Sequence, residues 1–130
     1  MVNELIKTIP GLVAGGAVTR YHIVKLSGDN AVAVATADTA PLLGIAASDA
    51  ASGEAVAVAG PRSIVGCVAG AQVTAGSYVT AGAGGVGVVS NPGATVNSNV
   101  VGIALTGASA AGEYFSVLVL PQRIQGAGTL

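Results

Sequence analysis

Small and branched apolar residues alternate along much of this chain, which is the pattern of β-strands. Residues 31–36 are Ala-Val-Ala-Val-Ala-Thr and residues 55–59 are Ala-Val-Ala-Val-Ala, so Val marks one face and Ala the other. Turn residues such as Ser-Gly-Asp-Asn and Asn-Pro-Gly separate these runs. The remaining strands are predicted at residues 21–26, 42–47, 85–89, 100–105 and 113–120.

Alanine favours helix by propensity, but glycines interrupt the Ala-rich runs and the apolar spacing is two instead of 3.6. The pattern therefore predicts an all-β fold. A short helix at residues 48–51 or 3–9 is the local alternative.

The chain contains two related halves. Leu-Gly-Ile-Ala-Ala-Ser at residues 43–48 matches Val-Gly-Ile-Ala-Leu-Thr at 101–106, and Ala-Ser-Gly-Glu at 51–54 matches Ala-Ala-Gly-Glu at 110–113. The repeats extend over about residues 14–62 and 69–123. Two copies are too few for a solenoid. They predict one β domain over residues 14–123, a small barrel or sandwich, with an N-terminal arm at 1–13 and a C-terminal tail at 124–130.

The last predicted strand differs from the others because both of its faces are apolar, which indicates a strand covered on both sides. It lies in the core or at an interface between subunits, and the residues concerned are Tyr114, Phe115, Val117 and Val119.

The N-terminal arm carries large apolar residues ahead of a Pro-Gly hinge at residues 10–11: Val2, Leu5, Ile6 and Ile9. Such a segment can dock on a partner by adding a strand to a sheet edge or seating a helical face in a groove. The alternative is that it packs on its own domain or on another copy of the chain.

Charge and composition exclude several classes of protein. The 130 residues are 52% hydrophobic, 8% charged and 3% aromatic, with a net charge of −1. This balance argues against disorder and provides no basic footprint for nucleic acid. No 18-residue window is cleanly apolar and no secretory signal is evident, so neither a membrane helix nor export is expected.

Candidate chemistry is sparse. Residues 82–87 spell Gly-x-Gly-x-x-Gly, but no helix can follow and no acidic residue lies about 20 positions on, so we expect a hairpin loop and not a dinucleotide site. His22 is the only histidine, and Cys67 is expected to be a small buried side chain. Glu54 and Glu113 open equivalent predicted strands, where hairpin geometry explains them. We therefore expect no enzyme activity, cofactor or metal.

A surface poor in charge is difficult to keep dispersed as a monomer, and small side chains bury little area each. Self-association hides apolar surface and stabilises the fold by mass action. The sequence therefore predicts a homo-oligomer.

The repeated Gly-Ile-Ala and Gly-Glu motifs, at residues 44–46 and 53–54 and again at 102–104 and 112–113, resemble the Gly/Ala/Val-rich capsid decoration (cement) proteins of tailed bacteriophages. That group was formerly catalogued as a domain of unknown function. The resemblance implies a β-tulip-like domain that forms a homotrimer on the capsid exterior and clamps neighbouring subunits of the major capsid protein.

The same resemblance implies a virion protein without a cofactor, which is present in the host cytoplasm during assembly. Charge and hydropathy, as above, lead us to expect neither nucleic acid nor membrane as a partner. The capsid-binding role of the arm is our own inference. A fibre, tail or surface-layer component and a small-molecule-binding barrel are the alternatives.

Overall fold

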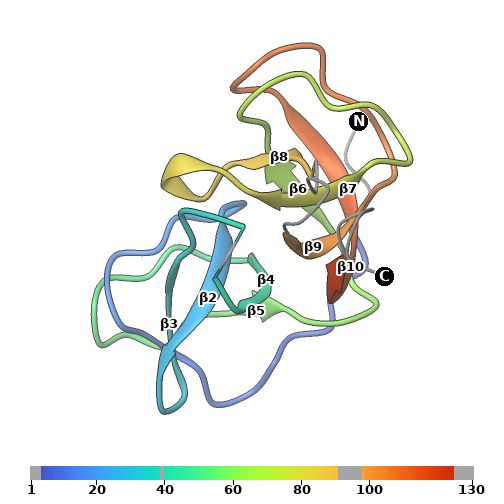
Figure 1. Ribbon diagram of the computed structural model, residues 1–130. Helices are drawn as coiled ribbons and strands as arrows, with labels where there is room; N and C mark the ends of the chain where they lie inside the picture. The colour runs from blue at the N-terminus through green and yellow to red at the C-terminus, as the bar shows by residue number, and fades with distance from the viewer. Residues whose placement is uncertain (1–3, 39, 91–97, 125–130) are drawn as a thin grey trace.

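The computed structural model describes residues 4–38, 40–90 and 98–124, and these residues form two five-stranded β-sheets, one from each half of the chain. The prediction of an all-β fold is confirmed. Figure 1 shows the two sheets as adjoining layers, the first in blue and green and the second in green to red. Val2 of the predicted arm and residues 125–130 of the predicted tail lie outside the described residues.

The first sheet has the order β1-β3-β2-β4-β5. Its strands are β1 (Val13–Ala14), β2 (Ile23–Gly28), β3 (Ala31–Val34), β4 (Leu42–Ala46) and β5 (Val58–Ala59). The second sheet has the order β6-β10-β9-β7-β8. Its strands are β6 (Ile64–Val68), β7 (Tyr78–Ala81), β8 (Gly87–Val89), β9 (Ser98–Ala104) and β10 (Tyr114–Ile124), and a 3-10 turn, η1 (Ala83–Gly85), joins β7 to β8.

The two halves make the same backbone hydrogen bonds. The N–H of Ala14 donates to the carbonyl of Glu54 over 2.8 Å, and that of Ala69 donates to Glu113 over 2.8 Å. Equivalent pairs of bonds join Val18 to Ala50 and Val73 to Ala108. The glycine before each glutamate, Gly53 or Gly112, has a φ of 88°. The duplicated sequence therefore encodes one β unit twice.

Each unit begins earlier than the sequence repeat. In the second half β6 pairs with β10, with Cys67 opposite Phe115. In the first half the N–H of Val56 donates to the carbonyl of Leu12 over 3.2 Å, in the equivalent place. Residues 9–12, within the segment that the sequence predicts as an arm, therefore complete the first unit as β6 completes the second.

A glycine occupies the same place in a central strand of each sheet. A Cβ atom on Gly44 in β4 would overlap the backbone carbonyl oxygen of Ala59, and one on Gly102 in β9 would overlap that of Leu118. Glycine usually weakens a strand interior, but here it permits the close approach of a neighbouring backbone. This contact explains why the Gly-Ile-Ala motif occurs twice.

One hydrophobic core spans both halves. It joins side chains from β2 and β4, such as Ile23 and Ile45, to Phe115, Val117 and other buried residues of the second sheet. A second core lies within the first half, around Val24, Val32 and Val58. Because the larger core draws on both sheets, the two halves pack together as one domain.

The Gly-rich loop at residues 82–87 helps to join the two halves. It forms the β7–β8 hairpin, as the sequence predicts. Gly85 has a φ of 81°, and a Cβ atom there would collide with the Val34 side chain in β3. Figure 1 shows this hairpin, in yellow, reaching over the end of the first sheet. Gly85 therefore permits close contact between the two sheets.

The two helix alternatives are not observed among the described residues, and the last strand is longer than predicted. Residues 48–51 form no helix, because Ala50 exchanges backbone hydrogen bonds with Val18. Among residues 4–9 of the other alternative helix, Leu5 and Thr8 form bridges to Ile64 and Ala59. Strand β10 continues past Pro121 to Ile124, because its register with β9 shifts between Val119 and Gln122. Proline lacks the N–H of a regular ladder and is accommodated at such a bulge.

Candidate interaction surfaces

Residues 4–9 of the N-terminal arm lie antiparallel to residues 58–64, which run from β5 into β6. Leu5 and Ile64 exchange two backbone hydrogen bonds of 2.8 Å each, and the Ile9 N–H donates to the Val58 carbonyl over 3.0 Å. Strands β5 and β6 end the order of their sheets. The arm therefore satisfies backbone groups along both edges, which would otherwise be open to pairing with other chains.

A buried serine anchors the middle of the arm. The Lys7 N–H donates to Oγ of Ser63 over 2.8 Å, and that hydroxyl donates to the Lys7 carbonyl over 3.2 Å. Ile6 and Ile9 pack against the two cores, but the Leu5 side chain is 60% exposed. The arm thus packs on its own domain, as one of the sequence alternatives has it, and presents Leu5 outward.

A cluster of four side chains lies where the arm meets both sheets; we call Glu4, Arg20, Tyr21 and Tyr114 the aromatic cluster. The Arg20 guanidinium lies 4.6 Å from the centre of the Tyr21 ring and forms an ion pair of 3.5 Å with Glu4. The Tyr21 and Tyr114 rings meet edge to face, 5.2 Å apart. Glu4 also accepts the N–H of Gly66 over 3.5 Å. These contacts connect the arm, the first half and the second half.

Tyr21 holds an unusual backbone conformation within this cluster. Its φ is 72°, in the left-handed region that bulky side chains rarely adopt. The Val68 N–H donates to its carbonyl over 3.1 Å, so the second sheet fixes this conformation. Its ring also packs against the shared core.

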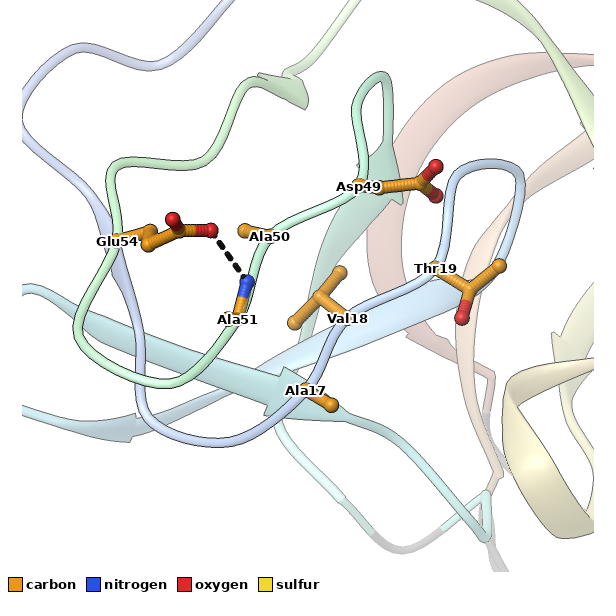
Figure 2. Close-up of a pocket in the computed structure, with 7 residues that line it drawn as sticks. All are labelled: Ala17, Val18, Thr19, Asp49, Ala50, Ala51 and Glu54. Atoms are coloured by element: carbon orange, nitrogen blue, oxygen red, sulfur yellow. Dashed lines mark hydrogen bonds between the residues drawn. The ribbon is translucent and has the colours of Figure 1, made fainter.

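Two shallow hollows lie on the first half. One, of about 410 Å³, is lined by Ala17, Val18, Thr19, Asp49, Ala50, Ala51 and Glu54 (Figure 2). Both of its carboxylates bind backbone groups: Glu54 accepts the Ala51 N–H over 2.7 Å, and Asp49 accepts that of Arg20 over 2.7 Å. They stabilise turns, as hairpin geometry predicts for Glu54. The other hollow, of about 520 Å³, is lined by residues 8–13, which include the Pro-Gly hinge, together with Ser48 and residues 55–57.

Glu113 has the equivalent turn role in the second half. It accepts the N–H of Ser109 over 2.8 Å and its hydroxyl over 2.9 Å. The Ser109 N–H, and then the hydroxyl, hold the pKa of Glu113 below its usual value.

The other chemistry-bearing residues are dispersed. His22 Nδ1 lies 3.2 Å from the Arg20 carbonyl oxygen. Cys67 is fully buried, as the sequence predicts. Among residues 4–38, 40–90 and 98–124, no three His, Cys, Asp or Glu side chains form a group that could hold a metal ion. That same part of the chain contains no helix long and apolar enough to cross a bilayer.

We expect Cys67 to make the fold sensitive to alkaline pH. Burial raises the pKa of its thiol from 9.0 to about 12, so above pH 9 the unfolded chain loses a proton that the folded chain keeps. Stability should therefore fall as pH rises between these two values. From pH 8 to pH 10 the wild type should lose about 1 kcal/mol more than Cys67→Ala in urea unfolding. Equal losses in the two proteins would contradict this prediction.

Strand β10 places its apolar residues in two different settings. Phe115, Val117 and Val119 are fully buried in the shared core, whereas Tyr114 is 56% exposed. The three buried residues therefore lie in the core of the chain, which is one of the two places that the sequence suggests for them. Tyr114 is the one residue of that set with a side chain available at the surface.

Neither Arg20 nor Tyr21 stands out in the sequence as a candidate binding residue. A signal existed in the repeat alignment, since the spacing that pairs Val18 with Val73 also pairs Tyr21 with Gly76. A tyrosine in one repeat that aligns with a positive-φ glycine in the other is a position where the two repeats differ in more than side-chain size. Glu4 lies outside both repeats and gave no such signal.

A solved structure shares this two-sheet β fold. The crystal structure of the N base of head fiber gp8.5 from bacteriophage phi29 matches with a TM-score of 0.64 and 21% sequence identity. The match covers 92% of this chain and 95% of that one. No family model matches the chain, and no curated protein does.

Proposed function

We propose that this chain is a structural protein of a tailed-phage head and binds the exterior of the capsid. The observation that carries the proposal is the fold shared with the phi29 head fiber base over nearly the whole length of both chains. The sequence motifs that resemble capsid decoration proteins support the same role independently. The finer proposal is a cement protein that binds as a homotrimer and bridges subunits of the major capsid protein.

A physical mechanism follows from these proposals. Packaged DNA pushes the shell outward, and a protein that bridges several subunits raises the free energy needed to separate them. Three copies of a weak site in one trimer gain avidity without new contacts. A bridging interface of this kind should bury at least about 1,000 Å².

A fibre component is the second candidate, since the neighbouring structure is itself the base of a head fiber. Electron microscopy of heads that carry the protein distinguishes the two: compact knobs support a cement protein, and projecting fibres support a fibre component. Light scattering of the free protein should give three times the chain mass of 12.3 kDa, and a monomer at high concentration would contradict the trimer.

We expect the purified chain to co-sediment with heads that lack it. We also expect Leu5→Ser to bind more weakly, because Leu5 is a large apolar residue of the arm that is 60% exposed and can contact a partner. This substitution leaves the backbone bonds to Ile64 in place, whereas deleting the arm would uncover both sheet edges. Thr8→Ser, elsewhere on the arm, is the control. Failure of the wild type to bind would refute the proposed function, and equal binding by Leu5→Ser would refute the role of the arm.

A further inference from the structure

We infer that the aromatic cluster, and Arg20 and Tyr114 in particular, is a surface through which this chain binds the protein shell of the head. This inference rests on the proposed function and names the contact by which it would act. The expected partner is a shell protein that offers a carboxylate to Arg20 beside a flat apolar surface for the Tyr114 ring.

The duplication supplies an internal reference for this surface. The first half has Tyr21 where the second half has Gly76, and the two backbones are bonded alike: the Tyr21 N–H donates to the Ala46 carbonyl over 2.9 Å, and that of Gly76 to Ala104 over 2.7 Å. The repeat spacing likewise pairs Arg20 with Ala75, and Tyr114 with Ala55. The β unit therefore forms with small residues at all three positions, and the large side chains are additions to it.

The backbone at Tyr21 adds a second argument. Gly76 adopts a φ of 91° at no steric cost, but Tyr21 holds a φ of 72° with a bulky side chain. Such strain persists only where the surrounding structure enforces it, and it occurs often at functional positions. Tyr21 in turn supports the other members of the cluster, since Arg20 stacks on its ring and Tyr114 meets it edge to face.

If the cluster served only to hold the fold together, its side chains would be buried, but two of them are exposed. Tyr21 contributes to the junction between the sheets, through its ring and its carbonyl. Tyr114, however, is 56% exposed, and the Arg20 side chain is 46% exposed. Tyr21 thus supports the cluster from inside the protein, and the Tyr114 and Arg20 side chains face outward.

The chemistry of the outward residues indicates a protein partner. Tyrosine and arginine are enriched among the residues that contribute most to protein–protein binding. Within the described residues, the single ion pair of Arg20 is the 3.5 Å contact with Glu4. A guanidinium in so long an ion pair can take a partner's carboxylate in a shorter, bidentate one. Stacking on Tyr21 limits the freedom that Arg20 would lose on binding.

The test measures binding of variants to purified heads that lack this chain, by co-sedimentation over a range of concentrations. We expect Tyr114→Ala to raise the Kd about 30-fold and Arg20→Gln about 10-fold. The matched controls are Tyr78→Ala, which removes a 41% exposed tyrosine on β7, and Arg123→Gln, which removes an exposed arginine on β10. Both controls should bind within twofold of the wild type.

The outcomes separate this inference from the proposed function. If the wild type does not bind heads, the proposed function fails and the inference fails with it. If the wild type binds and both cluster variants bind within twofold of it, the inference alone is overturned. If the two cluster variants bind heads normally but bind host-cell polysaccharide less well than the wild type, the cluster is a glycan-binding site. That result would also overturn the inference. If Tyr114→Ala fails to fold, Arg20→Gln and Arg20→Glu decide, because the Arg20 side chain lies at the surface.

Discussion

Replacing Phe115 with Asp is expected to abolish cooperative unfolding of this protein. Phe115 is the chain's single phenylalanine and is fully buried in the core shared by the two sheets. Truncating a buried phenylalanine alone costs about 3–5 kcal/mol, a large part of the roughly 5–15 kcal/mol that stabilises a domain. An aspartate there would also bury a carboxylate without a partner. Both effects act on the same core.

The measurement is thermal unfolding followed by circular dichroism, with Leu105→Asp as the matched control. Leu105 is 44% exposed, so the same chemical change at that position should alter stability by no more than about 0.5 kcal/mol. Phe115→Asp should show no transition at any temperature. A cooperative transition near that of the wild type would mean that Phe115 does not lie in the core.

Gly102→Ala and Gly44→Ala are each expected to destabilise the protein by about 3 kcal/mol. In both cases the new methyl group would overlap a backbone carbonyl oxygen on the neighbouring strand, and strands cannot separate without loss of ladder hydrogen bonds. Because the two glycines hold equivalent places in the two units, their costs should be similar.

Gly16→Ala is the control for these substitutions. A Cβ atom on Gly16 would meet nothing within 4 Å, and its φ is not in the left-handed region, so alanine there should be neutral or slightly stabilising. Chemical denaturation measures all three variants. If Gly102→Ala proved as stable as Gly16→Ala, the close approach of β9 and β10 would be refuted.

Substitutions in the exposed part of the aromatic cluster and substitutions in the buried core should have different effects. Phe115 and the glycines should change stability, whereas Tyr114 and Arg20 should change binding. A variant of Phe115 that lost head binding would be uninformative about the interface, since it would have lost the fold. For this reason the binding experiments use the two surface residues.

Local patterning predicted most of the fold. Alternation of Val and Ala located β3, and the paired motifs located β4 and β9 in equivalent places. Local patterning did not predict β1, β6 or β7. These short strands have no alternation of apolar and polar residues, and their pairing with adjacent strands defines them. The bulge that carries β10 through Pro121 depends on the register with β9, which no local pattern specifies.

The candidate surfaces were less predictable than the fold. Leu5 and Tyr114 were identified from their apolar character, but their exposure depends on which other segments cover them. Ile6 and Leu5 are adjacent in sequence, yet Ile6 packs on the core and Leu5 faces outward. The aromatic cluster combines residues from three distant segments, and only the folded chain brings them together.

The sequence by itself determined that this chain forms β structure, that it forms one β unit twice, and that glycine occurs at the centre of each unit. These features follow from side-chain size and from the preferred conformations of individual residues, which act over a few positions. Only the tertiary structure decided that the arm covers two sheet edges, that Gly85 sits against β3 and that the Tyr21 ring meets the Tyr114 ring. Those contacts join residues far apart along the chain, and their formation depends on how the two sheets pack.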